Sequence, residues 1–229
     1  MVIPHESLAY KIEISVSGPI GGNSVSEENG RTDIQLDTGS VIGPGGETGS
    51  AYATANLATG SLALKVSATT PDQSTQSGMG LASIFISDHL TFKLDPGLPV
   101  ADIKFSMKVD GFPSCVNLSS NCFTNAIIRL GEMNDQALGL PLPDPKMLGV
   151  TITVVDGQEL PIEAFLSARV EINNFIDVSD PSATIRLTLP PGVTFTSESR
   201  AFLGLQPPLD EPSPRAPVSS DPNGDGKSD

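Results

Sequence analysis

The sequence predicts an all-β protein, an antiparallel β-sandwich of the jelly-roll kind, with an extended proline-rich tail at its C-terminus. Three observations predict this class. Apolar and polar residues alternate with period two in several segments, as they do in strands with one buried face. Sequences typical of tight turns separate these segments. Glycine (22) and proline (20) together supply 42 of the 229 residues, which is typical of short strands joined by many turns.

The clearest alternation is in IKFSMKVDG, where Ile103, Phe105, Met107 and Val109 are expected to face inward. Because the intervening residues are polar, each sheet has one wet face, and two sheets must pack together to bury their apolar faces. The same pattern predicts further inward residues: Tyr10, Ile12, Ile14, Val16, Ile34, Leu36, Leu62, Leu64, Val66, Leu90, Phe92, Leu94, Val150, Ile152, Val154, Val170, Ile172, Ile185, Leu187 and Leu189.

Turns are predicted between these strands, at residues 95–97, 110–111, 156–157 and 190–192, where proline fixes φ or glycine tolerates positive φ. One segment departs from the pattern. In LPIEAFLSA, residues 160–168, an early proline followed by good helix formers predicts a short helix, with a strand as the alternative.

Three regions are expected along the chain. Residues 1–205 form the β-sandwich domain, and residues 206–220 form a linker rich in proline and poor in core-forming residues. Residues 221–229 form a partial calcium-binding loop. No apolar stretch reaches the roughly 18 residues of a membrane span.

The charge balance restricts the partners. The chain carries 13 Lys and Arg against 27 Asp and Glu, a formal net charge of -14 at pH 7. Such a surface repels phosphate backbones and anionic lipids, so neither nucleic acid nor a membrane is an expected partner. It keeps a protein soluble, and it also attracts divalent cations.

The C-terminal residues DPNGDGKSD offer oxygen ligands at regular spacing. Asp221, Asn223, Asp225 and Asp229 supply side-chain oxygens, and Lys227 would supply its backbone carbonyl. Calcium takes six to eight oxygens at about 2.3–2.6 Å, and alternate residues of a tight loop can converge on one ion. The spacing resembles the loops of thrombospondin type 3 repeats and of dockerins. A calcium site is therefore expected here, with a flexible acidic terminus as the alternative.

The two cysteines, Cys115 and Cys122, lie in a polar, loop-like stretch without CxxC spacing. A disulfide that closes this loop in an oxidising compartment is the simplest interpretation, and two free thiols are the alternative. Asn117 lies between them in an Asn-Leu-Ser sequon, which makes it a candidate glycosylation site.

Signals of catalysis are weak, and we expect no enzymatic activity. The DTGS sequence at residues 37–40 resembles the active-site turn of aspartic proteases, but it occurs once, whereas those enzymes need two copies. A Ser/His/Asp arrangement would depend on His89, and no GxSxG nucleophile elbow is present. Tryptophan is absent, which also removes the usual aromatic platform for sugars.

Two longer stretches resemble secreted bacterial proteins of the PEP-CTERM sorting group: AYATANLATGSLALKVSAT at residues 51–69 and LPPGVTFTSESRAFL at residues 189–203. The resemblance implies an extracellular or matrix β-sandwich protein of a Gram-negative-like bacterium, without known enzymatic activity. Proteins of this group are sorted to the cell exterior.

Together these features favour an extracellular structural protein, a subunit of a surface fibre or matrix that assembles as a homo-oligomer or polymer. Strand edges and calcium would join the copies, with residues 10–17 as the expected donor strand. The alternative is a calcium-dependent carbohydrate-binding or adhesion module that recognises an extracellular polysaccharide.

Overall fold

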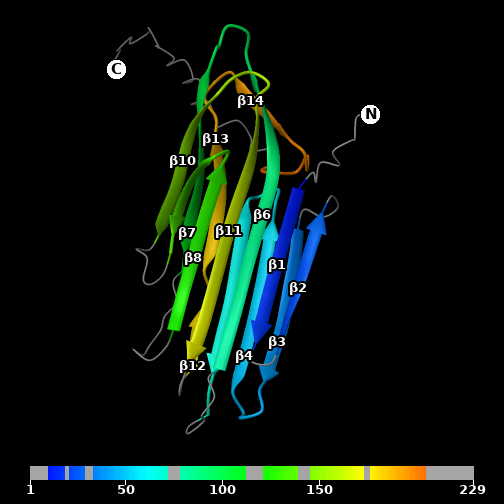
Figure 1. Cartoon of the computed structure of the whole chain (residues 1–229), viewed down its shortest axis with the longest axis vertical. Coiled ribbons are helices and arrows are strands. Elements are labelled where there is room, and N and C mark those ends of the chain that lie inside the picture. Colours follow the sequence, from blue (N-terminus) through cyan, green and yellow to red (C-terminus); the bar gives the residue numbers. More distant parts are fainter. Residues whose placement is uncertain are drawn as a thin grey trace, which may run out of the picture.

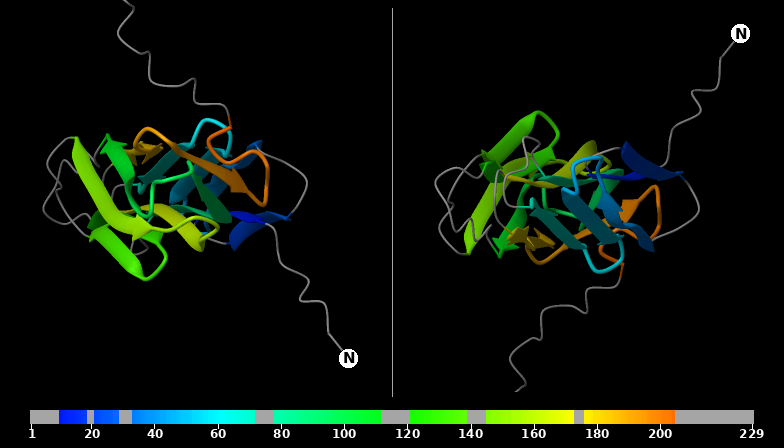
Figure 2. Two further views of the ribbon diagram at one scale, coloured as in Figure 1. Left: turned by 90° about the horizontal axis from the view of Figure 1, so that it is seen from above. Right: turned by 90° about the horizontal axis from the view of Figure 1, so that it is seen from below.

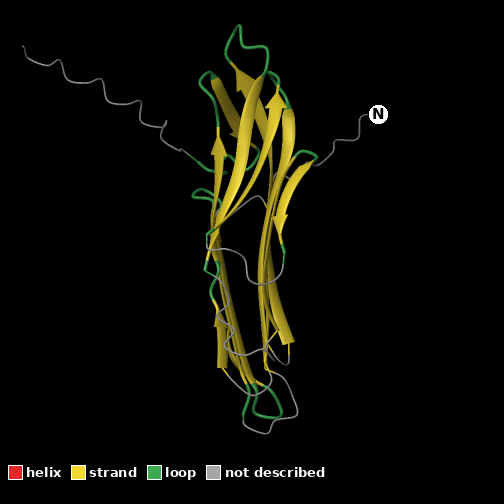
Figure 3. Cartoon of the chain, turned by 90° about the vertical axis from the view of Figure 1, so that its left-hand side faces the viewer, coloured by secondary structure: helices red, strands yellow, loops and turns green. Residues whose placement is uncertain are grey.

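A computed structural model of the chain describes residues 10–18, 21–28, 33–71, 78–111, 121–138, 145–172 and 176–204. Two antiparallel sheets lie face to face in an elongated sandwich, with loops at both ends (Figures 1 and 3). The described residues contain strands and no helix. The predicted antiparallel β-sandwich is therefore confirmed.

Sheet A has the order β2 (Gly21–Glu28), β1 (Tyr10–Gly18), β6 (Gly78–Leu94), β11 (Glu159–Ile172), β8 (Asn121–Leu130) and β9 (Met133–Ala137), and β14 (Val193–Ser197) also pairs with β6. Sheet B has the order β10 (Lys146–Val154), β7 (Ala101–Asp110), β13 (Ser182–Thr188), β5 (Ser61–Thr69), β4 (Thr48–Asn56) and β3 (Asp33–Ile42), and β12 (Ile176–Ser179) also pairs with β5.

The alternation places the predicted residues in the space between the sheets. In β7, all four residues expected to face inward are buried. The same holds for the inward residues of β5 and for those of β6 beyond residue 89. Leu36, Ile152 and Leu189 are half-buried at the margins of this core. The side chains of β1 and of Ile172 lie outside the part of the chain that the structure describes, so their predicted orientation stays a prediction.

The helix predicted for residues 160–168 is wrong and its alternative, a strand, is confirmed, because this segment belongs to β11. The strand pairs with β6 on one side and with β8 on the other. Its alternate residues Ile162, Ala164, Leu166 and Ala168 are buried in the core. Pairing on both sides outweighs the local helix propensity. Pro161 is accommodated near the start of β11, where its carbonyl oxygen accepts a hydrogen bond from Gly131 N at 2.8 Å.

Small residues let the two sheets approach closely at the end where β6 begins. A Cβ placed on Gly80 would lie 2.7 Å from the backbone oxygen of Ser67 and 2.9 Å from that of Ser50. The inward residues of β4 are alanines, Ala51, Ala53 and Ala55, all buried. The alternating small residues of AYATAN therefore set a short distance between the layers in this region.

The segment that follows β14 covers the core beside the turn between β4 and β5. After Ser197 the chain turns back, and Leu203 N donates to Leu57 O at 3.0 Å. Phe202 and Leu203 are buried, and the Phe202 ring lies 6.5 Å from that of Phe105, centroid to centroid. We call residues 198–204 the C-terminal clasp. Residues 205–229 lie outside the described part, so the predicted linker and tail stay predictions.

Strand β1 is an internal strand of sheet A. It pairs with β2 on one side and with β6 on the other, over nearly its whole length. The segment expected to be donated to a neighbour is thus already paired within its own chain, and the free edges of the sandwich are formed by other strands.

Candidate functional site

The predicted site residues lie mostly outside the described part of the chain. This holds for the calcium loop (Asp221, Asn223, Asp225, Lys227 and Asp229), for Cys115 and for the sequon at Asn117. Cys122 lies in β8 with a fully buried side chain. The calcium site, the disulfide and the glycosylation site therefore stay predictions.

Within the described ranges, no group of three or more His, Cys, Asp or Glu side chains is arranged to hold a metal ion. In the same ranges no helix has the length and apolar character needed to cross a membrane.

Each flank of the sandwich presents one edge strand from each sheet. Strands β9 and β10 form one flank, and β2 and β3 form the other. Figure 1 shows these flanks at the left and right of the molecule, and the end views of Figure 2 show them as the green and blue sides. The open edges of both sheets are thus gathered at two places.

The edge of β10 exposes a row of backbone groups. Gly149 N points away from β7, because it donates to Asp135 Oδ2 of β9 at 2.9 Å. Alternate residues of an antiparallel strand point the same way, and the β10–β7 register is unbroken. The N–H and C=O groups of Met147, Gly149, Thr151 and Thr153 therefore all face the open flank.

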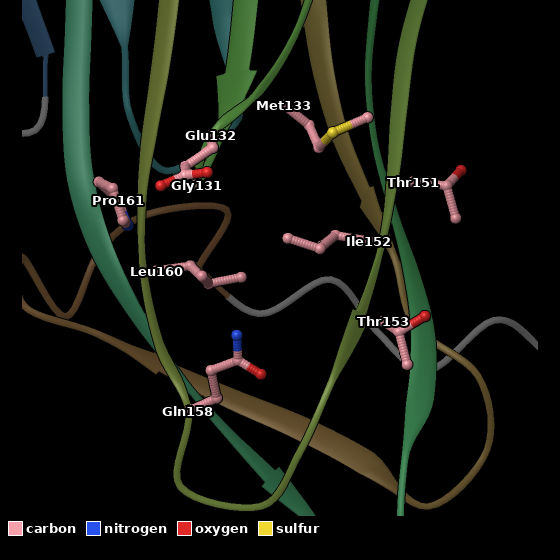
Figure 4. Close-up of a pocket in the computed structure, with 9 residues that line it drawn as sticks. All are labelled: Gly131, Glu132, Met133, Thr151, Ile152, Thr153, Gln158, Leu160 and Pro161. Atoms are coloured by element: carbon pink, nitrogen blue, oxygen red, sulfur yellow. The ribbon is translucent and has the colours of Figure 1, made fainter.

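Apolar side chains are exposed along this flank. Met133 of β9 is 50% exposed and Met147 of β10 is 55% exposed. Beside them lies an open concavity of about 710 Å³, bounded by the β8–β9 turn, β10 and the start of β11. Ile152 and Leu160 point toward each other across it (Figure 4). Exposed apolar surface at a sheet edge is typical of a contact surface.

The opposite edge, β3, contains the DTGS sequence, which forms a β-bulge. The register between β3 and β4 shifts between Asp37 and Ser40. Gly39 has a φ of +62°, and its N–H donates to Asp37 Oδ1 at 2.8 Å. The Asp37 carboxylate is thus engaged in a local turn on an exposed edge, and a bulge is a common device at such edges. In this structure the DTGS sequence that resembles a protease turn is therefore a β-bulge of an edge strand.

The backbone groups of β3 can be assigned from one bond near this bulge. Ala51 N donates to Thr38 Oγ1 at 2.9 Å, so Ala51 points toward β3, and so do alternate residues of β4. Their partners Ile34 and Leu36 are thus bonded to β4. Asp33, Gln35 and Asp37, which alternate with them, point their backbone groups away from the sheet.

A second cluster of polar groups lies in the interior, where Asp88 of β6 meets the C-terminal clasp. Asp88 is only 1% exposed. Ser199 Oγ donates to Asp88 Oδ2 at 2.5 Å, and the backbone N–H groups of His89 and Ser199 donate to Asp88 Oδ1 at 2.7 and 3.3 Å. Ser199 Oγ accepts hydrogen bonds from the N–H groups of Ala201 and Phe202 at 3.1 and 3.0 Å.

Burial raises the pKa of the Asp88 carboxyl, and the hydrogen bond from the Ser199 hydroxyl opposes this shift. The arrangement fastens the clasp to β6. A serine hydroxyl has one donor and two lone pairs. In Ser199 the hydroxyl donates to Asp88 of β6, and its oxygen accepts from two N–H groups of the clasp. His89 is 3.4 Å from Glu198 (Nδ1 to Oε2). We interpret the cluster as a structural feature that holds the C-terminal clasp against β6.

The sequence prediction missed Asp88 as a buried group. The signal was present, since Ile84, Ile86, Asp88 and Leu90 share one phase of the alternation in β6 and all four are buried. The expected strand began only at Leu90. Asp135, which covers Gly149 N, carries no comparable signal, because it belongs to a strand of the other sheet and local alternation does not indicate that contact.

Comparisons with known proteins add no assignment. No protein-family model matches the chain, and no curated protein matches it with significance. Functional inference therefore depends on the geometry of the two flanks.

Proposed function

We propose that the protein is an extracellular structural protein, a subunit of a surface fibre or matrix whose copies join through the edges of their sheets and bind calcium near the C-terminus. The observation that carries the proposal is the edge of β10. Its outward row of backbone groups and the exposed side chain of Met147 lie on one flank of the sandwich. An unpaired edge gains main-chain hydrogen bonds along its length when another strand adds to it.

The first test measures particle size. Light scattering on the full chain across a range of concentrations, with calcium and with a chelator, is expected to show particles larger than the 23.8 kDa single chain. Growth that a chelator reverses supports both the assembly and the calcium component. A single-chain mass under every condition contradicts the proposal.

A matched pair of variants tests the edge itself. Met147→Lys places a charge on the β10 edge, where lysine opposes strand addition, and it is expected to abolish growth. Val100→Lys is the control, because Val100 is 48% exposed and precedes Ala101, which pairs with Val154 at the end of β10 that is far from Met147. Equal loss in both variants would show that surface charge in general, and not the edge, governs assembly.

The concavity in Figure 4 favours one second candidate, a calcium-dependent carbohydrate-binding module. The Gln158 amide lines the concavity and could bond a saccharide, whereas the Thr151 and Thr153 side chains point away from Ile152 and Leu160 (Figure 4). The nine lining residues include no aromatic ring, so a saccharide would be held by polar contacts alone. Glycan-array binding that a chelator abolishes, by a protein that stays a single chain, would favour this module over the structural protein.

A further inference from the structure

We infer that the partner of the β10 edge is the β3 edge of a second copy of this chain, so that copies join head to tail and extend sheet B. This inference rests on the proposed function, which names edges in general, and it adds which two edges meet and what occupies them.

The strand directions permit this joining without any rotation of the copies. Every neighbouring pair along the path from β10 to β3 is antiparallel, and the path contains an odd number of such steps. Strands β10 and β3 therefore run in opposite directions. A second copy shifted sideways presents its β3 antiparallel to the β10 of the first. Each joined pair keeps one free β10 and one free β3, which is the condition for an open fibre.

The lengths and the free backbone groups of the two edges also match. Strand β10 has 9 residues and β3 has 10. Met147, Gly149, Thr151 and Thr153 face outward on the first edge, while Asp33, Gln35 and Asp37 face outward on the second. Antiparallel pairing joins such alternate residues directly.

The side chains of the two edges are complementary in the antiparallel direction. Met147, the second residue of β10, is exposed, and β3 ends with Ile42, which is 65% exposed. Antiparallel pairing brings these apolar ends together. It also brings the middle of β10 opposite the middle of β3, where Asp37 is exposed.

The charge at the middle of the β10 edge comes from Lys104 of the neighbouring strand β7. A Cβ on Gly149 would lie 3.3 Å from Lys104 Cε, so the lysine stem extends across the edge strand where glycine has no side chain. The ammonium group is thereby carried toward the open flank. Opposite charges across such a contact direct the pairing and set its register.

Asp135 covers this edge in the single chain. Its bond to Gly149 N has to break before a neighbouring strand can bond the same N–H. A charged side chain at a sheet edge is a common protection against unwanted pairing. Asp135→Ala is therefore expected to lower the concentration at which assembly begins, while an unchanged or higher threshold would count against the inference.

A charge exchange between the two edges tests the pairing. Lys104→Glu and Asp37→Lys are each expected to raise the concentration needed for assembly by about tenfold, because each replaces an attraction by a repulsion. A mixture of the two variants is expected to assemble close to the wild-type threshold, since Lys104 of one meets Asp37 of the other, and the reversed residues also pair with each other. Lys65→Glu, an exposed residue of the inner strand β5, is the matched control and is expected to have no effect.

Asp37→Asn is the control for a folding defect in Asp37→Lys, because it removes the charge and keeps an oxygen that can accept the hydrogen bond from Gly39 N. It is expected to raise the threshold by a smaller factor than Asp37→Lys. Wild type that assembles while the mixture fails to recover overturns the head-to-tail pairing and leaves edge assembly intact. Wild type that stays a single chain overturns the pairing together with the proposed function.

Discussion

The bond between Ser199 and Asp88 is the sharpest point at which stability can be tested, because it joins residues far apart in the sequence inside the core. Ser199→Ala removes the hydroxyl that donates to the Asp88 carboxylate at 2.5 Å. A hydrogen bond to a charged group contributes about 1.5–3 kcal/mol. The N–H groups of Ala201 and Phe202 also lose their acceptor. We expect the free energy of unfolding at pH 7 to fall by about 2–4 kcal/mol.

The pH dependence of this loss follows from the shift at Asp88. Burial raises the folded-state pKa above the ordinary value of 3.8, so the Asp88 contribution to stability is fully present below 3.8 and is lost as pH rises through the folded-state pKa. The Ser199 bond lowers this pKa, and its removal raises the pKa further. The deficit of Ser199→Ala relative to wild type should therefore grow with rising pH.

Urea denaturation followed by circular dichroism, below pH 3.8 and at pH 7, measures this deficit. Asp88→Asn is the matched background, because an amide at this position does not ionise, and there the pH dependence of the Ser199→Ala loss should disappear. An equal loss at both pH values in the wild-type background, or the same pH dependence in the Asp88→Asn background, would refute the reasoning.

Substitutions at three further positions test the packing and the backbone conformation by the same denaturation measurement. Phe202→Ala should cost about 3–5 kcal/mol by leaving a cavity beside Phe105, while Phe202→Leu should cost clearly less; similar losses would show that the clasp packs loosely. Gly80→Ala should cost about 1–3 kcal/mol, since the new methyl group meets backbone oxygens of the opposite sheet, and an unchanged stability would mean that the sheets can separate there. Gly39→Ala should cost about 1 kcal/mol from its positive φ alone, because nothing lies within 4 Å of the new atom; Gly39→Asn should cost less, and a reversed order would exclude strain as the cause.

The core strands were predictable because the alternation of apolar and polar residues within each strand indicates which side chains are buried. Ile103, Phe105, Met107 and Val109 are separated by residues with polar side chains, and this spacing alone indicates which face is dry. The helix predicted for residues 160–168 fails for the complementary reason. Its residues have adequate helix propensity, but the two strands that enclose β11 come from distant parts of the chain.

The sequence by itself determined the class of the protein, its alternation of inward and outward residues and the position of many turns. These properties depend on neighbouring residues, since side-chain direction repeats every two positions along a strand. Only the tertiary structure decided which strands became edges, that Lys104 lies over Gly149, and that Asp88 meets Ser199. Such contacts depend on strand order and register, which long-range packing sets and which no short segment of the chain encodes.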